Sequence, residues 1–194
     1  MVEFESPDSV ETALSAVGEL LDAAKQPAAV VIVGGAALNL LGFVSRTTRD
    51  VDVIAQSYTD AAGKRRLAQA EPFPPALEEA IATVSRDLSL PQDWMNTVVA
   101  KQWSQGLPPW TAQDLEWRSY GALEVGLVGR RTLIALKLFA AVDQGPDSVH
   151  VQDLLALVPT PAELESAVEW VRSQDTSPEF VAMVDQVVQH VQAR

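Results

Sequence analysis

Apolar residues recur with a helical period near the start of the chain and again throughout its last third. The first helical segment begins at Ser6-Pro7, because Pro favours the first position of a helix, and it ends before Pro27. In the last third, Thr160 and Glu163 have the spacing of a capping box and mark another helix start. The same period predicts helices over residues 76–88, 131–142, 149–158, 162–171 and 178–191.

Short apolar runs predict the strands of a sheet. Residues 29–33 and 50–55 are expected to form two buried strands, and residues 98–103 and 122–128 are compatible with two more. The basic residues 64–66, by contrast, open a segment that we expect to be helical.

These elements predict an α/β (α+β) fold class with a short mixed sheet followed by a helical C-terminal portion. The expected boundary separates an α/β core, residues 1–128, from a helical portion, residues 129–194. The two parts are either separate or packed together as one domain.

Composition excludes several classes of function. The 194-residue chain has no cysteine, so it has no disulfide framework and no thiolate metal site. No apolar run reaches the roughly 20 residues that a membrane span needs, and no signal-peptide pattern is present. We therefore expect no membrane association and a cytoplasmic location.

The net charge of −12 argues against a broad nucleic-acid-binding surface, which is normally basic. The charge is unevenly distributed, because 12 of the 14 Lys and Arg residues lie within residues 1–137. A polyanionic substrate is expected to approach this part of the chain. The basic residues that could contact RNA are Lys64, Arg65, Arg66, Lys101, Arg130 and Arg131.

The segment from residue 30 to residue 53 carries the clearest chemistry. Gly34-Gly35 ends the first strand and permits a tight turn, and the helix start that follows offers free N–H groups to a phosphate. Asp50 and Asp52 are two apart on the next strand, so alternation points both carboxylates to one side. Two such acids are either solvated or share a hard cation, for which Mg²⁺ or Mn²⁺ fits carboxylate oxygens. The combination predicts a nucleoside-triphosphate site with Asp50 and Asp52 as metal ligands.

This segment resembles the signature of the AbiEii/MenT-type toxin nucleotidyltransferases, a branch of the DNA polymerase β-like nucleotidyltransferase superfamily. The resemblance implies that Gly34, Gly35, Ala36, Arg46 and Thr48 bind the nucleotide. Arg46 and Thr48 otherwise complete the loop before the strand, and Arg46 alternatively orients the two carboxylates. Many relatives have Ser at the position of Ala36, so one side-chain contact with the triphosphate is missing here. The matching residues are Gly34-Gly35-Ala36-Ala37, Gly42 and Arg46-x-Thr48-x-Asp50-Val51-Asp52-Val53.

Lys137 is the single charged residue in the apolar helical stretch from residue 133 to residue 142. A helix that is apolar on every side is buried, and a buried ammonium needs a partner or a polar cavity. Lys137 either extends to the rim of the core or binds the nucleotide phosphates. The resemblance implies a catalytic role for Lys137 and for an aspartate in the next helix, Asp153. Asp153 is otherwise a first-turn acid or a structural partner of Lys137.

The resemblance implies an enzyme of the EC 2.7.7 type, in which Mg²⁺ supports transfer of a nucleoside monophosphate from a nucleoside triphosphate to an acceptor hydroxyl. It further implies the toxin of a toxin–antitoxin pair that acts on tRNA and has a cognate antitoxin as partner. A third metal-binding carboxylate is common in the superfamily, and Glu124 is the acid best placed for that role. Two alternatives remain: a protein or small-molecule acceptor, or a degenerate module that binds a nucleotide or a partner without turnover.

Overall fold

The computed structural model describes residues 4–193, apart from the side chain of Ser104. The chain forms two compact units. The first comprises Met1–Leu107 and Leu115–Val128, and the second comprises Pro108–Asp114 and Gly129–Arg194.

Within the described part of the first unit, six strands form one mixed sheet. The strand order is β3-β2-β1-β6-β5, and the short β4 pairs with β2. The central strand β1 is antiparallel to β2 and parallel to β6. This sheet, followed by helices in the rest of the chain, confirms the predicted α/β (α+β) fold class. The strands are β1 (Ala28–Val33), β2 (Val51–Thr59), β3 (Arg65–Gln69), β4 (Met95–Asn96), β5 (Leu115–Tyr120) and β6 (Leu123–Val128).

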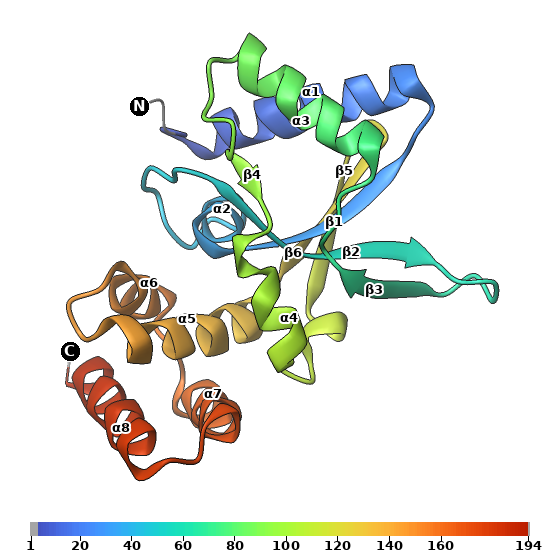
Figure 1. The fold of residues 1–194 in the computed structure, drawn as a ribbon. Coiled ribbons are helices and arrows are strands. Elements are labelled where there is room, and N and C mark those ends of the chain that lie inside the picture. Colours follow the sequence, from blue (N-terminus) through green and yellow to red (C-terminus); the bar gives the residue numbers. More distant parts are fainter. Residues whose placement is uncertain (1–3, 194) are drawn as a thin grey trace. The chain divides into compact units, whose positions relative to one another are not determined.

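Strand β3 corrects the prediction of a helix after residue 64. The residues from Arg65 pair antiparallel with β2 as a hairpin (Figure 1). Asp60 shapes the turn, because its carboxylate accepts hydrogen bonds from the backbone N–H groups of Ala62 and Lys64, each at 2.9 Å. Residues 64–66 are all basic and therefore show no apolar periodicity, so pairing with β2 decided the conformation of this segment.

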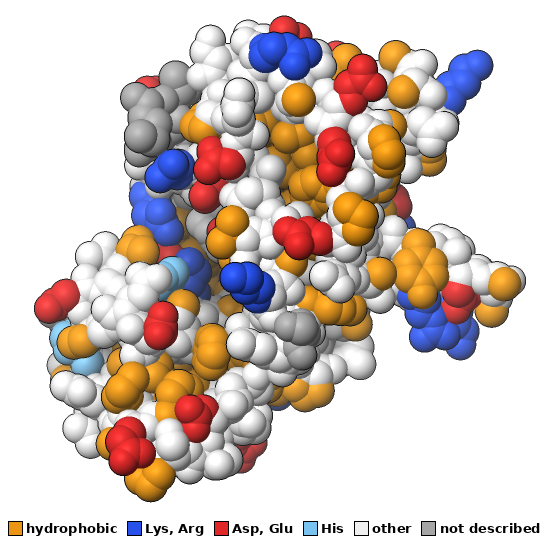
Figure 2. Space-filling view, in the orientation of Figure 1, with side chains coloured by type: hydrophobic (Ala, Val, Ile, Leu, Met, Phe, Trp, Pro, Cys, Tyr) orange, Lys and Arg blue, Asp and Glu red, His pale blue; other side chains and the backbone are white. Residues whose placement is uncertain are grey.

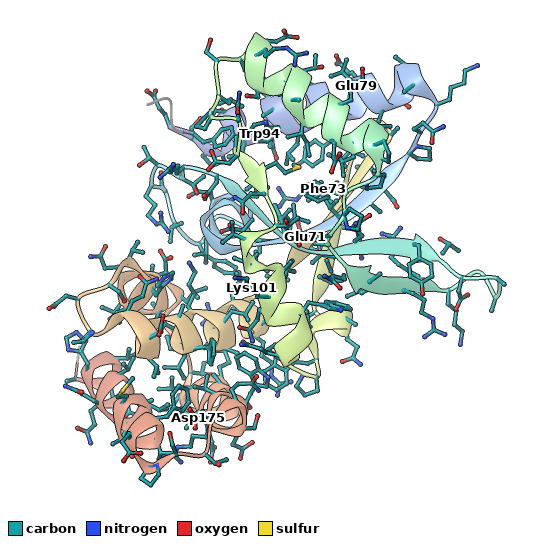
Figure 3. All side chains as sticks on the ribbon, viewed as in Figure 1. Glu71, Phe73, Glu79, Trp94, Lys101 and Asp175 are labelled. Carbon is teal, nitrogen blue, oxygen red and sulfur yellow. The ribbon has the colours of Figure 1, made fainter. Side chains whose placement is uncertain are left out.

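Helices α1 and α3 lie side by side in Figure 1, and α1 also packs against β5 and β6. Trp94, labelled in Figure 3, lies just before β4 and is fully buried. It donates a hydrogen bond from its indole Nε1 to the Ile81 carbonyl of α3 at 3.1 Å. The helices of this unit are α1 (Pro7–Ala24), α2 (Gly34–Leu40), α3 (Pro75–Asp87), the 3₁₀ turn η1 (Val98–Ala100) and α4 (Lys101–Gln105).

The prediction of a strand over residues 98–103 is wrong, because these residues form η1 and the start of α4. The apolar run looked like a buried strand, but Val98 is exposed and the segment pairs with no strand of the described sheet.

The second unit contains the predicted helices of the last third of the chain. Helix α5 contacts α6, α7 and α8, and Phe139 of α5 packs on Trp170 and Phe180 with ring centroids 5.9 and 6.2 Å apart. Thr160 and Glu163 form the predicted capping box of α7. No helix of the described residues is long and apolar enough to cross a membrane. The elements are η2 (Thr111–Gln113), α5 (Arg130–Gln144), α6 (Val149–Leu157), α7 (Pro161–Gln174) and α8 (Pro178–Gln192).

Candidate active site

The turn between β1 and α2 brings polar side chains against two glycines. Gly34 has a positive φ of 75°, and a Cβ atom built there would lie 2.6 Å from Oδ2 of Asp52. A Cβ atom on Gly35 would lie 2.7 Å from the Thr48 hydroxyl and 3.3 Å from Nη2 of Arg46. Any side chain at either position would displace one of these polar groups. We call these five residues the glycine site.

Asp52 reaches the glycine site from β2. Its strand partner is Val33, the last residue of β1, so the carboxylate lies beside the turn that follows Val33. The predicted proximity of the glycine pair to Asp52 therefore follows from the β1–β2 register.

The loop between α2 and β2 holds Arg46 and Thr48 in place through backbone contacts. The buried Asn39 side chain donates to the Arg46 carbonyl at 2.7 Å and accepts from the Arg46 N–H at 3.4 Å. The backbone of Thr48 exchanges two hydrogen bonds with the backbone of Phe4, at 2.8 and 3.1 Å. The Thr48 side chain is buried against Gly35, and its hydroxyl also donates to the Asp50 carbonyl at 3.3 Å.

Asp50 lies one residue before the start of β2 and is half-buried. Burial raises the pKa of its carboxyl group above the ordinary value, the positive charge of Arg49 opposes this shift, and the negative charge of Asp93 adds to it. Asp93 precedes β4, which runs parallel to the start of β2. Sequence reasoning missed Asp93, because the 42 residues between it and Asp50 gave no sign that the two acids interact.

Glu124 is not part of the glycine site, which corrects its candidacy as a third metal ligand. It pairs with Ala29 on β1, whereas Asp52 pairs with Val33, so the two acids are about 13 Å apart along the strand direction. Its carboxylate instead accepts a hydrogen bond from Nη2 of Arg65 at 2.7 Å. Among the described residues, no group of three or more His, Cys, Asp or Glu side chains is placed to hold a metal ion.

The residues predicted to contact RNA are largely engaged with other groups. Arg65 bonds Glu124, and Arg66 bonds Asp60 at 2.8 Å. The two side chains alternate along β3, so they point to opposite faces of the sheet. In the second unit, Arg130 bonds Glu163 at 2.8 Å, and Arg131 stacks on Trp110 with its Cζ atom 3.8 Å from the ring centroid.

Lys137 and Asp153 meet inside the second unit. The ammonium of Lys137 on α5 lies 2.7 Å from Oδ2 of Asp153 on α6, and the side chains are 7% and 2% exposed. The burial predicted for Lys137 is therefore observed, and its partner is the aspartate that the resemblance singled out. The geometry is that of a buried ion pair.

Comparison with protein families gives a match that covers part of the chain. Residues 12–100 match the family model described as a nucleotidyltransferase of unknown function (DUF6036), so this part of the chain is similar to nucleotidyltransferases. The matched segment contains the whole glycine site and Asp50. Lys137 and Asp153 lie outside it.

A solved structure is also similar to the chain. It is the crystal structure of an antigenic nucleotidyltransferase-like protein from Paracoccidioides brasiliensis, with a TM-score of 0.46 and 16% sequence identity over 95% of each chain. No curated protein sequence matches the chain.

Proposed function

We propose that the protein is a Mg²⁺-dependent nucleotidyltransferase that uses a nucleoside triphosphate as donor. The observation that carries this proposal is the glycine site. The Asp52 carboxylate, the Thr48 hydroxyl and the Arg46 guanidinium all approach the turn after β1 so closely that only glycine fits at positions 34 and 35. The similarity of residues 12–100 to nucleotidyltransferases supports the same class.

The available donors fit a hard divalent cation. Asp50 and Asp52 supply carboxylate oxygens, and the chain has no cysteine that would favour a softer metal. Mg²⁺ is commonly held by one or two carboxylates together with substrate phosphates, so a third protein carboxylate is not required. When bound, the ion would neutralise negative charge on the phosphates.

In the proposed reaction, the acceptor hydroxyl oxygen forms a bond to the α-phosphorus while the bond from that phosphorus to the bridging oxygen breaks. Pyrophosphate leaves with the bonding electrons, and the hydroxyl proton passes to water. Arg46 donates hydrogen bonds to the phosphate oxygens, and the Thr48 hydroxyl turns from the Asp50 carbonyl to donate to one of them. Charged donors of this kind stabilise the charge that develops in the transition state.

The acceptor is proposed from the family resemblance. We propose that the chain is the toxin of a toxin–antitoxin pair and that it modifies the 3′ end of tRNA. A second candidate is a protein or small-molecule acceptor, and one observation favours it. Arg65, Arg66 and Arg130 each form an ion pair with an acid of their own unit, which reduces the positive charge available to an RNA backbone.

The test is incubation with each α-labelled nucleoside triphosphate, Mg²⁺ and total RNA, followed by separation of RNA, protein and small molecules. The wild-type chain should transfer label, and addition of a chelator should stop the transfer. Asp52→Asn should reduce transfer at least 100-fold with an unchanged melting temperature. Gly35→Ala should also reduce it, because the new methyl group displaces the Thr48 hydroxyl.

Label on RNA would support the tRNA proposal, whereas label on protein or on a small molecule would support the second candidate. Binding of nucleotide without any transfer would refute the enzymatic proposal and identify a module without turnover.

A further inference from the structure

A stacked group of three residues lies on the sheet of the first unit, outside the glycine site. The ring of Trp117 on β5 lies over Gly126 on β6, where an added Cβ atom would be 3.0 to 3.2 Å from ring carbons. On the same ring, the Cζ atom of Arg65 lies 3.8 Å from the centroid. A glycine inside a strand often marks a place where another group approaches the backbone closely, and here the absence of a side chain on Gly126 lets the indole pack on the strand.

Arg65 holds a defined orientation and is still accessible. Glu124 bonds its Nη2 atom at 2.7 Å, and the Arg65 and Glu124 side chains are 37% and 44% exposed. One plane of the guanidinium covers the indole, which leaves the opposite plane as a surface on which a flat ligand can stack.

The stack faces the same side of the sheet as Asp52. Trp117 pairs with Gly126, and Gly126 pairs with Val31. Val31 and Val33 share a face through strand alternation, and Val33 pairs with Asp52. The stack is therefore on the face that carries the catalytic carboxylate of the proposed reaction.

This face is concave, because residues from the two edges of the sheet meet on it. Strands β3 and β5 are at opposite ends of the strand order, about 19 Å apart in a flat sheet, yet Arg65 touches Trp117. Figure 1 shows that β2 and β3 run in a clearly different direction from β5 and β6.

The separation of the stack from the glycine site matches the length of a nucleotide. Trp117 is two strand spacings from β1 and level with Val31, so a flat sheet would place it about 12 Å from the end of β1, and the curvature of this face shortens that distance. An extended nucleoside triphosphate spans a comparable distance from its terminal phosphate to its base.

The β2–β3 hairpin that carries Arg65 is rich in cations, although Arg65 and Arg66 each pair with an acid. Figure 2 shows Lys and Arg side chains gathered on the β2–β3 hairpin, where Lys64, Arg65 and Arg66 are consecutive.

We propose that Arg65, supported by Trp117 and Glu124, binds the nucleobase of the donor nucleotide by stacking. This inference rests on the proposed function, because it assumes phosphates at the glycine site. Stacking on aromatic rings and guanidinium planes accepts any base, so all four nucleotides should bind.

The experiment compares the binding of ATP with that of inorganic tripolyphosphate, which has the phosphates but no base. Isothermal titration calorimetry with Mg²⁺ and without acceptor measures both. Arg65→Ala should weaken ATP binding about tenfold, the size expected for one stacked base, and should leave tripolyphosphate binding unchanged. Arg65→Lys should behave in the same way, because lysine keeps the charge but lacks the flat guanidinium.

Arg66→Ala is the matched control. It removes the same charge from the adjacent residue on the opposite face of β3, and it should leave the binding of both ligands unchanged. The proposal is overturned if Arg65→Ala leaves ATP binding intact, or if it weakens ATP and tripolyphosphate equally.

Transfer activity separates this inference from the function on which it rests. If Asp52→Asn abolishes transfer while Arg65→Ala has no effect on ATP binding, the base site is wrong and the enzyme assignment stands. If Arg65→Ala selectively weakens ATP binding but Asp52→Asn transfers label normally, the base site stands and the assigned reaction is wrong. If the wild-type chain binds neither ATP nor tripolyphosphate, both the base site and the proposed function are refuted.

Discussion

Replacing Lys137 with Met tests the buried ion pair of the second unit. The substitution keeps an unbranched apolar stem and removes the ammonium, so the Asp153 carboxylate loses a partner at 2.7 Å while only 2% of its side chain is exposed. Breaking such a pair from one side typically costs about 3–5 kcal/mol, because a charge is left in a poorly solvated site. We expect Lys137→Met to lower the free energy of unfolding by about that amount.

The double variant Lys137→Met/Asp153→Leu removes both charges and should recover most of the loss. Replacement of a buried pair by apolar residues is often neutral or stabilising. Urea unfolding followed by circular dichroism and tryptophan fluorescence measures all four corners of the double-mutant cycle. The expected coupling between the two sites is at least about 2 kcal/mol.

Arg172→Met is the control, because Arg172 forms an exposed ion pair with Asp185 in the same unit. Its loss should change the free energy of unfolding by no more than about 1 kcal/mol. The prediction is refuted if Lys137→Met lowers the free energy of unfolding no more than Arg172→Met does. It is also refuted if the effects of Lys137→Met and Asp153→Leu on the free energy of unfolding are additive. A folded double variant also allows triphosphate binding, the role that the family resemblance suggests for Lys137, to be measured separately from stability.

Two further predictions concern the segment that joins α6 to α7. The Arg130 guanidinium bonded to Glu163 holds the pKa of that carboxyl at about 2, below its ordinary value of 4.5. The ionised carboxylate therefore stabilises the folded state fully above pH 4.5, and this stabilisation is lost as pH falls toward 2. Acid unfolding monitored by circular dichroism should therefore show that Glu163→Gln is less stable than wild type near neutral pH. The difference in stability should shrink as pH falls from 4.5 toward 2, and a constant difference would contradict the lowered pKa of Glu163. Val158 has a positive φ of 47°, which glycine adopts more readily than valine, and its side chain is 73% exposed. Val158→Gly should therefore raise the free energy of unfolding by about 0.5–1 kcal/mol in urea titrations. No gain would show that the backbone at Val158 is unstrained.

The sequence was informative wherever the signal is local. Helices α1, α3 and α5 to α8 follow from apolar periodicity, and both predicted helix starts, at Ser6-Pro7 and at Thr160, are present with their capping boxes. A helix closes its hydrogen bonds within a few residues, so neighbouring side chains largely determine where it begins and ends. The glycine pair after β1 could be recognised for the same reason.

The surroundings of the charged residues depended on the tertiary structure. Glu124 looked like a metal ligand, but the parallel register of β6 with β1 places it beside Arg65. Asp93 lies near Asp50 because β4 pairs with the start of β2.

The sequence by itself therefore determined helices α1, α3 and α5 to α8, the apolar strand β1 and the glycine turn, since each is encoded in a short stretch of chain. The tertiary structure decided the conformation of residues 64–69 and 98–103, and it decided which charges meet. The pairing of Arg65 with Trp117 and of Lys137 with Asp153 joins residues from separate strands or helices. Such contacts are set by strand order, register and helix packing, and these arise only when distant segments bury their apolar faces together.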